Sequence, residues 1–148
     1  MALFSKKPAE KKRRILIAED SDFQRSILKA IVESEPTFKV IEARDGEEAW
    51  KVIEKQKPDL ALLDVMMPKV NGLDICFRMK GDTNYKNIPV MIVTASSQDT
   101  GKTDEYWRDR ARADDFITKP FKSIDIIRRI KKLIEDYESG AASKRFKL

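Results

Sequence analysis

The sequence predicts an α/β protein in which helices cover both faces of an open parallel β-sheet. Two observations lead to this fold class. Short apolar segments alternate five times with stretches of helical periodicity along the 148 residues, and this order implies right-handed crossovers between parallel strands. Several apolar segments are also unbroken, as in strands buried on both faces. We expect one domain over residues 13–138, with basic, flexible tails at residues 1–12 and 139–148.

The elements follow one another in a regular order. Strands are expected at residues 14–18, 38–43, 59–64, 88–93 and 115–118. Helices are expected at residues 22–34, from residue 45 toward Pro58, and at residues 73–80, 103–111 and 123–137. Asp22 is the expected N-cap of the first helix, and Asp45, with Glu48 three residues later, opens the second. Gly140 marks the end of the last helix.

Each helix is expected to bury an apolar face. In the first helix this face consists of Phe23, Ile27, Leu28, Ile31 and Val32. In the third, Cys76 shares an apolar stripe with Leu73 and Phe77, so we interpret it as core packing rather than as a nucleophile. The residues of the last helix expected to face inward are Ile124, Ile127, Ile130, Leu133 and Ile134.

Charge and composition exclude several classes of function. The chain has a net charge of +5, but residues 1–14 carry +5 and residues 139–148 carry +3, which leaves −3 for the rest. A mildly acidic body argues against direct nucleic-acid binding. No apolar run approaches a membrane span and no signal peptide is present, so we expect no membrane association and a cytoplasmic location. A single cysteine and the absence of histidine exclude an intramolecular disulfide, His-dependent triads and the usual zinc sites.

Polar side chains stand where the predicted strands end. Glu19 and Asp20 follow the first strand, Asp64 ends the third, Thr94 ends the fourth and Lys119 follows the fifth. Because the carboxyl ends of parallel strands share one edge of a sheet, these side chains should converge. Three converging carboxylates repel one another, and a hard divalent cation relieves that repulsion. Ligands that are oxygen atoms only favour Mg²⁺ over zinc.

These strand ends also match a known pattern. The matching segments read Ile-Leu-Ile-Ala-Glu-Asp at 15–20, Pro-Asp-Leu-Ala-Leu-Leu-Asp-Val-Met-Met-Pro at 58–68, Gly72, Val-Thr-Ala at 93–95 and Ile-Thr-Lys-Pro-Phe at 117–121. Together they closely resemble the receiver domain of bacterial two-component response regulators, in particular stand-alone receivers similar to chemotaxis regulators. The resemblance covers about residues 13–137. It implies a flavodoxin-like fold with five helices and a five-stranded sheet in the order 2-1-3-4-5.

The resemblance also implies the chemistry of the site. Asp64 would accept a phosphoryl group from a phosphohistidine on a sensor histidine kinase or phosphotransfer protein. Mg²⁺ would be held by Asp20, by Glu19 through water, by Asp64 and by the backbone carbonyl of Met66. Lys119 would neutralise charge on the phosphoryl oxygens. Such a protein is a signalling phosphoacceptor rather than an enzyme, with only self-directed phosphotransfer and autodephosphorylation.

A switch is implied as well. The Thr94 hydroxyl would turn toward the new phosphoryl group, and the Phe116 ring would enter the space that Thr94 leaves. The face formed by residues 103–111, 115–118 and 123–137 would then bind a downstream target protein or support a phosphorylation-dependent homodimer. Met66 and Ser96 match positions that tune phosphate lifetime, and Lys119-Pro120 matches a cis-proline site.

The chain departs from the family pattern at three positions. Glu19 stands where Asp is commoner, and Phe116 replaces a frequent tyrosine. Arg112 stands where glycine usually precedes Ala-Asp, so we expect Arg112 to be strained or differently turned.

Three alternatives stay open on the sequence. The first is a haloacid dehalogenase-like phosphohydrolase, because Asp20-Ser21-Asp22 matches its Asp-x-Asp signature, although Gln24 stands where that signature expects Thr. The second is a degenerate receiver that docks partners without phosphorylation. The third is a receiver fragment of a larger regulator whose DNA-binding or cyclase output domain follows residue 148.

Overall fold

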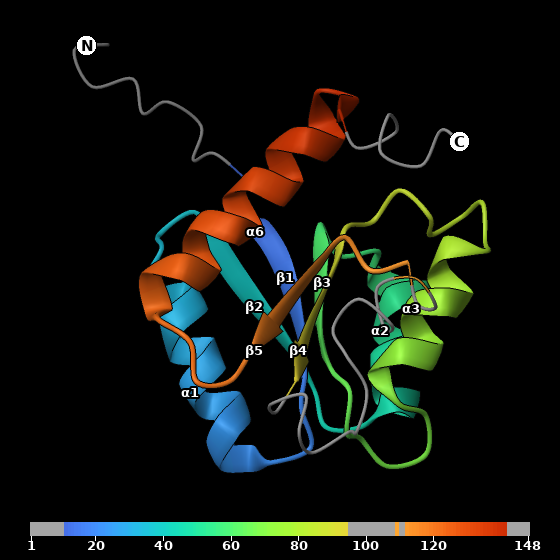
Figure 1. Ribbon diagram of the computed structural model, residues 1–148, viewed down its shortest axis with the longest axis horizontal. Helices are drawn as coiled ribbons and strands as arrows, with labels where there is room; N and C mark the ends of the chain where they lie inside the picture. Colours follow the sequence, from blue (N-terminus) through green and yellow to red (C-terminus); the bar gives the residue numbers. More distant parts are fainter. Residues whose placement is uncertain (1–10, 95–108, 110–111, 142–148) are drawn as a thin grey trace, which may run out of the picture.

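The computed structural model describes residues 11–94, 109 and 112–141, and these form a three-layered α/β unit (Figure 1). Its strands are β1 (Arg13–Ala18), β2 (Phe38–Ala43), β3 (Leu60–Asp64), β4 (Val90–Thr94) and β5 (Asp115–Thr118). Its helices, numbered as in Figure 1, are α1 (Asp22–Glu33), α2 (Gly46–Gln56), α3 (Gly72–Lys80) and α6 (Ser123–Glu138). The helix expected at 103–111 lies outside the described residues except for Asp109, which is helical.

The sheet is parallel throughout and runs in the order β2-β1-β3-β4-β5, which confirms the predicted topology. Helices α1 and α6 cover one face, and α2 and α3 cover the other (Figure 1). Alternate residues of β3 enter the two cores: Leu60 and Leu62 pack on the α1–α6 side, and Leu63 packs on the α2–α3 side. A strand covered on both faces needs apolar residues at every position, which explains its unbroken apolar run.

Of the two predicted N-cap residues, one is confirmed and one is wrong. Asp45 caps α2 as predicted, since its carboxylate accepts the Glu48 amide at 2.8 Å. The prediction that Asp22 caps α1 is wrong. Ser21 is the cap, and its hydroxyl accepts the Gln24 amide at 3.2 Å. Asp22 instead pairs with Arg25 one turn later.

The expected apolar faces are wrong at several positions. Phe23 is 74% exposed, and Ile27 on α1, Phe77 on α3 and Ile124 on α6 are also exposed. The buried stripe of α1 consists of Arg25, Leu28 and Val32. A charged residue, Arg25, therefore occupies a position that faces the sheet. Because apolar periodicity alone does not count Arg25, it placed the buried face of α1 too close to Phe23 and Ile27. In α6 the buried residues are Ile126, Ile130, Leu133 and Ile134.

Cys76 is fully buried in the core between the sheet and the α2–α3 layer. Burial raises the pKa of its thiol to about 12. Because the thiolate is the nucleophilic form, this environment confirms core packing and leaves the thiol unreactive near neutral pH.

The opposite edge of the sheet, at the amino ends of β4 and β5, contains a buried polar network that the sequence did not indicate. The Asp114 carboxylate accepts the Lys80 ammonium at 2.8 Å, the Tyr137 hydroxyl at 2.6 Å and the Val90 amide at 2.8 Å. Lys80 also donates to the Ile88 carbonyl at 2.9 Å. The network ties α3 and α6 to β4 and β5 with every charge paired, which is the arrangement that buried ions require.

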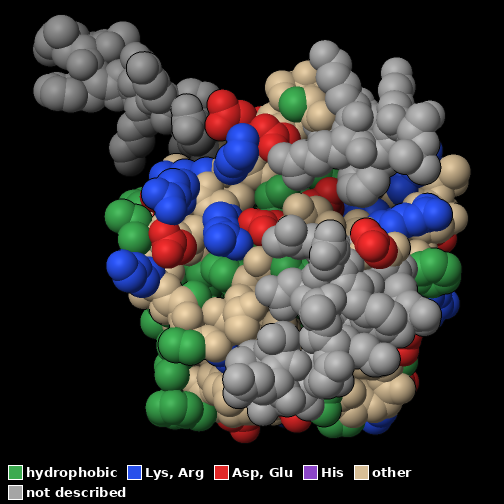
Figure 2. Space-filling view, viewed as in Figure 1, with side chains coloured by type: hydrophobic (Ala, Val, Ile, Leu, Met, Phe, Trp, Pro, Cys, Tyr) green, Lys and Arg blue, Asp and Glu red, His purple; other side chains and the backbone are tan. Residues whose placement is uncertain are grey.

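The surface charge of the described body is mixed. Figure 2 shows Lys and Arg side chains interspersed with Asp and Glu in the region of α6. Arg128 pairs with Asp125 at 2.7 Å, and Lys131 pairs with Glu35 at 2.8 Å. These pairs offset opposite charges locally on this part of the surface. Within the described residues, none of the helices is both long and apolar enough for a bilayer span.

Arg112 adopts the left-handed conformation, with φ of 58°, as its replacement of glycine suggested. We expect Arg112→Gly to raise the free energy of unfolding by about 0.5–1 kcal/mol, because the Cβ penalty exceeds the entropy cost of glycine. Urea denaturation followed by circular dichroism measures the change. Arg112→Ala, which keeps Cβ, should show no such gain; an equal gain in both variants would assign the effect to the lost side chain.

Candidate functional site

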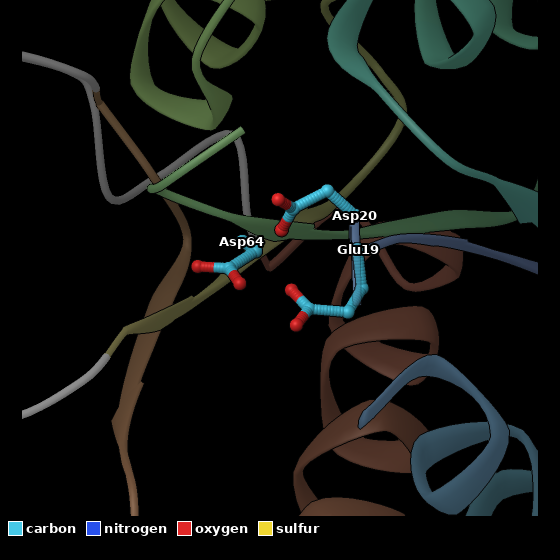
Figure 3. Close-up of side chains that lie close together, drawn as sticks. All are labelled: Glu19, Asp20 and Asp64. Carbon is cyan, nitrogen blue, oxygen red and sulfur yellow. The ribbon is translucent and has the colours of Figure 1, made fainter. Parts of the chain in front are cut away.

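The predicted site residues converge at the carboxyl edge of the sheet. The carboxylates of Glu19, Asp20 and Asp64 each place an oxygen within 4.8 Å of the others, and Figure 3 shows the three groups pointing toward one another. The Lys119 ammonium lies 3.7 Å from Asp64 Oδ2 and 3.9 Å from Glu19 Oε1. Thr94 ends β4 at the same edge.

Strand register explains this convergence. Strand β1 pairs with β3 up to Ala18 and Leu63, so the next residues, Glu19 and Asp64, face each other across two neighbouring strands. The Glu19 amide continues the β1–β2 ladder by donating to the Ala43 carbonyl at 3.1 Å. The Lys119 amide likewise extends the β4–β5 pair by donating to the Thr94 carbonyl at 2.9 Å. Backbone pairing at or just beyond a strand end therefore fixes four of the predicted site residues: Glu19, Asp64, Thr94 and Lys119.

The three carboxylates differ in burial. Glu19 is 1% exposed and Asp64 is 7% exposed, whereas Asp20 is open to solvent. Burial, followed by the neighbouring Asp64 carboxylate, raises the pKa of Glu19 from its ordinary value of 4.5 to about 8, and the Lys119 ammonium opposes this rise. Glu19 Oε2 has no hydrogen-bond partner among the described residues. An unpartnered buried carboxylate oxygen beside two further carboxylates fits an oxygen-ligated cation such as Mg²⁺.

The remaining predicted residues surround this cluster. The Met66 amide donates to Asp64 Oδ1 at 3.1 Å, and its side chain is exposed at the rim. Thr94 is 2% exposed, and its hydroxyl has no hydrogen-bond partner within the described part of the chain. Phe116 is buried in the core on the α2–α3 side. The Lys119–Pro120 peptide is cis, as the resemblance implied, and Ser96 lies outside the described residues.

Two residues at the start of α1 were missed as contributors to the site. The Gln24 side-chain oxygen accepts a hydrogen bond from the Lys119 ammonium. Arg25 is buried and donates to the Glu19 carbonyl at 2.9 Å. The available signal for Arg25 was its position three and seven residues before Leu28 and Val32, on the stripe that faces the sheet.

The fold and the site together define a doubly wound α/β protein with a cluster of three carboxylates at the carboxyl edge of its sheet. The chain belongs to the family of response regulator receiver domains, whose pattern its residues 15–131 match. This membership confirms the family and the phosphorelay signalling function expected from the sequence.

Known proteins with similar sequences are longer than this chain. The response regulator GtcR of Aneurinibacillus migulanus is 38% identical over 118 residues, which cover 80% of this chain and 46% of GtcR. The protein-glutamate methylesterase/protein-glutamine glutaminase of Pyrococcus abyssi is 40% identical over 121 residues, which cover 78% of this chain and 31% of that protein. The chain thus spans less than half the length of either relative.

Solved structures share the fold. The signal receiver domain of a signal transduction histidine kinase from Syntrophus aciditrophicus has a TM-score of 0.75 and 36% identity, covering 83% of this chain and 90% of that one. The receiver domain of the sensor histidine kinase PA1611 from Pseudomonas aeruginosa PAO1 has a TM-score of 0.74 and 24% identity, and the match covers 84% of this chain and 98% of that one.

Gly72 allows α3 to begin directly against the chain at Asp64. A Cβ at Gly72 would lie 2.2 Å from the Asp64 carbonyl oxygen, so that backbone must move in Gly72→Ala. We expect this variant to lose about 1–3 kcal/mol of unfolding free energy and to shift the Asp64 amide resonance. Urea denaturation and ¹⁵N NMR measure the two effects.

Gly81→Ala is the matched control, because its Cβ would meet nothing closer than 3.6 Å. It should leave the Asp64 resonance in place. An undisturbed Asp64 in Gly72→Ala would show that the close approach does not position the carboxylate.

Proposed function

We propose that Asp64 accepts a phosphoryl group from the phosphohistidine of a sensor histidine kinase or phosphotransfer protein, in a Mg²⁺-dependent reaction. The observation that carries this proposal is the position of Asp64. Its nearly buried carboxylate lies beside those of Glu19 and Asp20 and 3.7 Å from the Lys119 ammonium. Anionic ligands for a cation and a positive charge, both close to one carboxylate, are what phosphoryl transfer to that carboxylate needs.

The carboxylates of Glu19, Asp20 and Asp64, with the Met66 backbone carbonyl, would hold the Mg²⁺. When bound, the ion supplies positive charge to the oxygens of the transferred phosphoryl group. A similar fold supports the assignment, because the PA1611 receiver structure is described with a magnesium ion coordinated in its active site cleft. Asp20, as the exposed member of the cluster, leaves that side open to solvent and to an incoming ligand.

The protein groups have distinct parts in the transfer. The Asp64 carboxylate attacks phosphorus while the bond from phosphorus to the histidine nitrogen breaks and its electron pair returns to the imidazole. The Met66 amide holds one Asp64 oxygen at 3.1 Å and so fixes the direction of the carboxylate. Lys119 contributes its ammonium to the negative charge on the phosphoryl oxygens.

Phosphorylation would then change the protein's interaction surface. The buried Thr94 hydroxyl, which has no partner in the described part of the chain, can donate a hydrogen bond to a phosphoryl oxygen. Phe116, on the neighbouring strand, would follow the movement of Thr94 and alter the face formed by residues 103–111, β5 and α6, where a target protein or a second copy docks. Met66, exposed at the rim, and Ser96 would tune the lifetime of the phosphate.

The alternatives receive less support from the site. In a haloacid dehalogenase-like enzyme, Asp22 would act in the same centre as Asp20, but here the Asp22 carboxylate points to Arg25 and is exposed. A degenerate receiver would lack one of the chemical groups, whereas Glu19, Asp20, Asp64, Thr94 and Lys119 are all present. A larger regulator remains compatible with the site, since the relatives extend beyond the matched region.

Acetyl phosphate with Mg²⁺ tests the phosphoacceptor. We expect intact-mass spectrometry to show one added phosphoryl group in the wild type and none in Asp64→Asn, since the amide is not a nucleophile for phosphorus. Asp74→Asn, which removes an exposed carboxylate from α3, should keep full labelling. Undiminished labelling of Asp64→Asn would overturn the assignment. If Asp20→Asn at saturating Mg²⁺ also lost the labelling that Asp64→Asn kept, the phosphoacceptor would be Asp20 instead.

Thr94→Val tests the switch. Because the buried hydroxyl has no hydrogen-bond partner among the described residues, valine should raise the unfolding free energy of the unphosphorylated protein by about 1 kcal/mol. Beryllofluoride with Mg²⁺ should shift the ¹⁵N resonances of β5 and α6 in the wild type and in Thr94→Ser, which keeps the hydroxyl, but much less in Thr94→Val. A full response in the valine variant would contradict the proposed role of Thr94.

A further inference from the structure

We propose that Arg25 is a positioning residue that fixes the peptide between Glu19 and Asp20 and thereby directs both carboxylates toward Asp64. The inference rests on the proposed function for its consequence in Mg²⁺ binding, but the positioning itself is a property of the unliganded protein. Arg25 does not contact the expected phosphoryl position and acts only through the backbone of the acidic pair.

The guanidinium of Arg25 joins three parts of the chain. Its Nη1 donates to the Glu19 carbonyl at 2.9 Å, its Nη2 donates to Asp22 Oδ1 at 2.5 Å, and its Nε donates to Glu42 Oε1 at 3.2 Å. The three acceptors lie just after β1, in the first turn of α1, and on β2. Arg25 itself is only 8% exposed, so its planar fork is held by packing as well as by hydrogen bonds.

The Glu19 carbonyl is the informative contact. It belongs to the peptide unit whose two flanking residues are Glu19 and Asp20, so its orientation sets the direction of both side chains. The amide on the other side of Glu19 is held by the Ala43 carbonyl at 3.1 Å. With Arg25 on its carbonyl, the backbone of Glu19 is therefore fixed at both ends, just beyond the last sheet pairing of β1.

Charge alone does not account for this arrangement. Asp22 and Glu42 both pair with the guanidinium, so its positive charge is offset locally. What these partners provide is a fixed fork that presents Nη1 to the carbonyl. A lysine would keep the charge but offers a single ammonium that cannot reach three acceptors on three segments with the geometry of the fork.

The test compares Arg25→Met and Arg25→Lys with Glu42→Gln. The last variant removes the negative charge of an outer partner of Arg25 but keeps an oxygen that can accept from Nε, so the fork and the Glu19 carbonyl contact should stay in place. Thermal unfolding is recorded for all three, so that binding is compared among folded proteins. The readouts are the ¹⁵N resonances of Glu19 and Asp20 without added ions, the Mg²⁺ affinity by calorimetry, and the acetyl phosphate labelling rate as a function of Mg²⁺.

We expect both Arg25 variants to shift and broaden the Glu19 and Asp20 resonances and to weaken Mg²⁺ binding by about tenfold, as loss of a group that orients metal ligands does. Saturating Mg²⁺ should restore most of the labelling rate. Glu42→Gln should keep the wild-type resonances and Mg²⁺ affinity even where it lowers the melting temperature.

Wild-type Mg²⁺ affinity and resonances in a folded Arg25 variant would overturn the inference. Wild-type behaviour of Arg25→Lys would also overturn it, since the positive charge would then suffice. So would a loss of Mg²⁺ affinity in Glu42→Gln as large as that in the Arg25 variants. If Arg25→Met does not fold, Arg25→Lys carries the comparison. Failure of Asp64 labelling in the wild type would refute the proposed function, whereas the ion-free resonances still decide the role of Arg25.

Discussion

Repulsion among carboxylates at one edge of the sheet is the constraint on which the structure of the site depends. At the separations within the cluster of Glu19, Asp20 and Asp64, each ionised pair costs roughly 3–4 kcal/mol at an effective dielectric constant of about 20. Protonation of Glu19, whose pKa is raised to about 8, removes part of this repulsion near neutral pH. The register of β1 and β3, both buried in apolar cores, holds Glu19 and Asp64 close together. Stability in the sheet interior is thus what permits a strained charge distribution at its edge.

The two edges of the sheet manage buried polar groups in opposite ways. At the amino edge, Asp114 accepts hydrogen bonds from Lys80, Tyr137 and Val90, so its charge is paired and its oxygens are satisfied. At the carboxyl edge, Glu19 Oε2 and the Thr94 hydroxyl have no partners among the described residues. A satisfied network anchors α3 and α6, whereas unsatisfied groups favour whatever ligand supplies their missing partners. Among the described residues, satisfied and unsatisfied buried polar groups therefore lie at opposite ends of the same strands.

The strands and the convergence of the site could be predicted from the sequence because both follow from simple rules. A strand buried on two faces reads as an apolar run, and parallel strands end at a common edge, so residues at the ends of such runs must meet. The errors have a different origin. The cap of α1 and its buried face were misplaced because Arg25 draws Asp22 away from the cap and occupies a sheet-facing position. The Lys80–Asp114–Tyr137 network joins residues 23 to 57 positions apart, which no local pattern reveals.

Lys119 connects the start of α1 with the carboxylate cluster. Its ammonium donates to Gln24 on α1, while its distances of 3.7 and 3.9 Å to Asp64 and Glu19 exceed those of direct hydrogen bonds. The carboxylates therefore attract the Lys119 ammonium without forming a direct hydrogen bond to it. The ammonium donates instead to the amide oxygen of Gln24, which is a weaker acceptor than an anion. A phosphoryl group on Asp64 would present a stronger acceptor at a shorter reach. Neighbouring residues of α1 thus contact both parts of the site, since Gln24 accepts from the Lys119 ammonium and Arg25 donates to the backbone of the acidic pair.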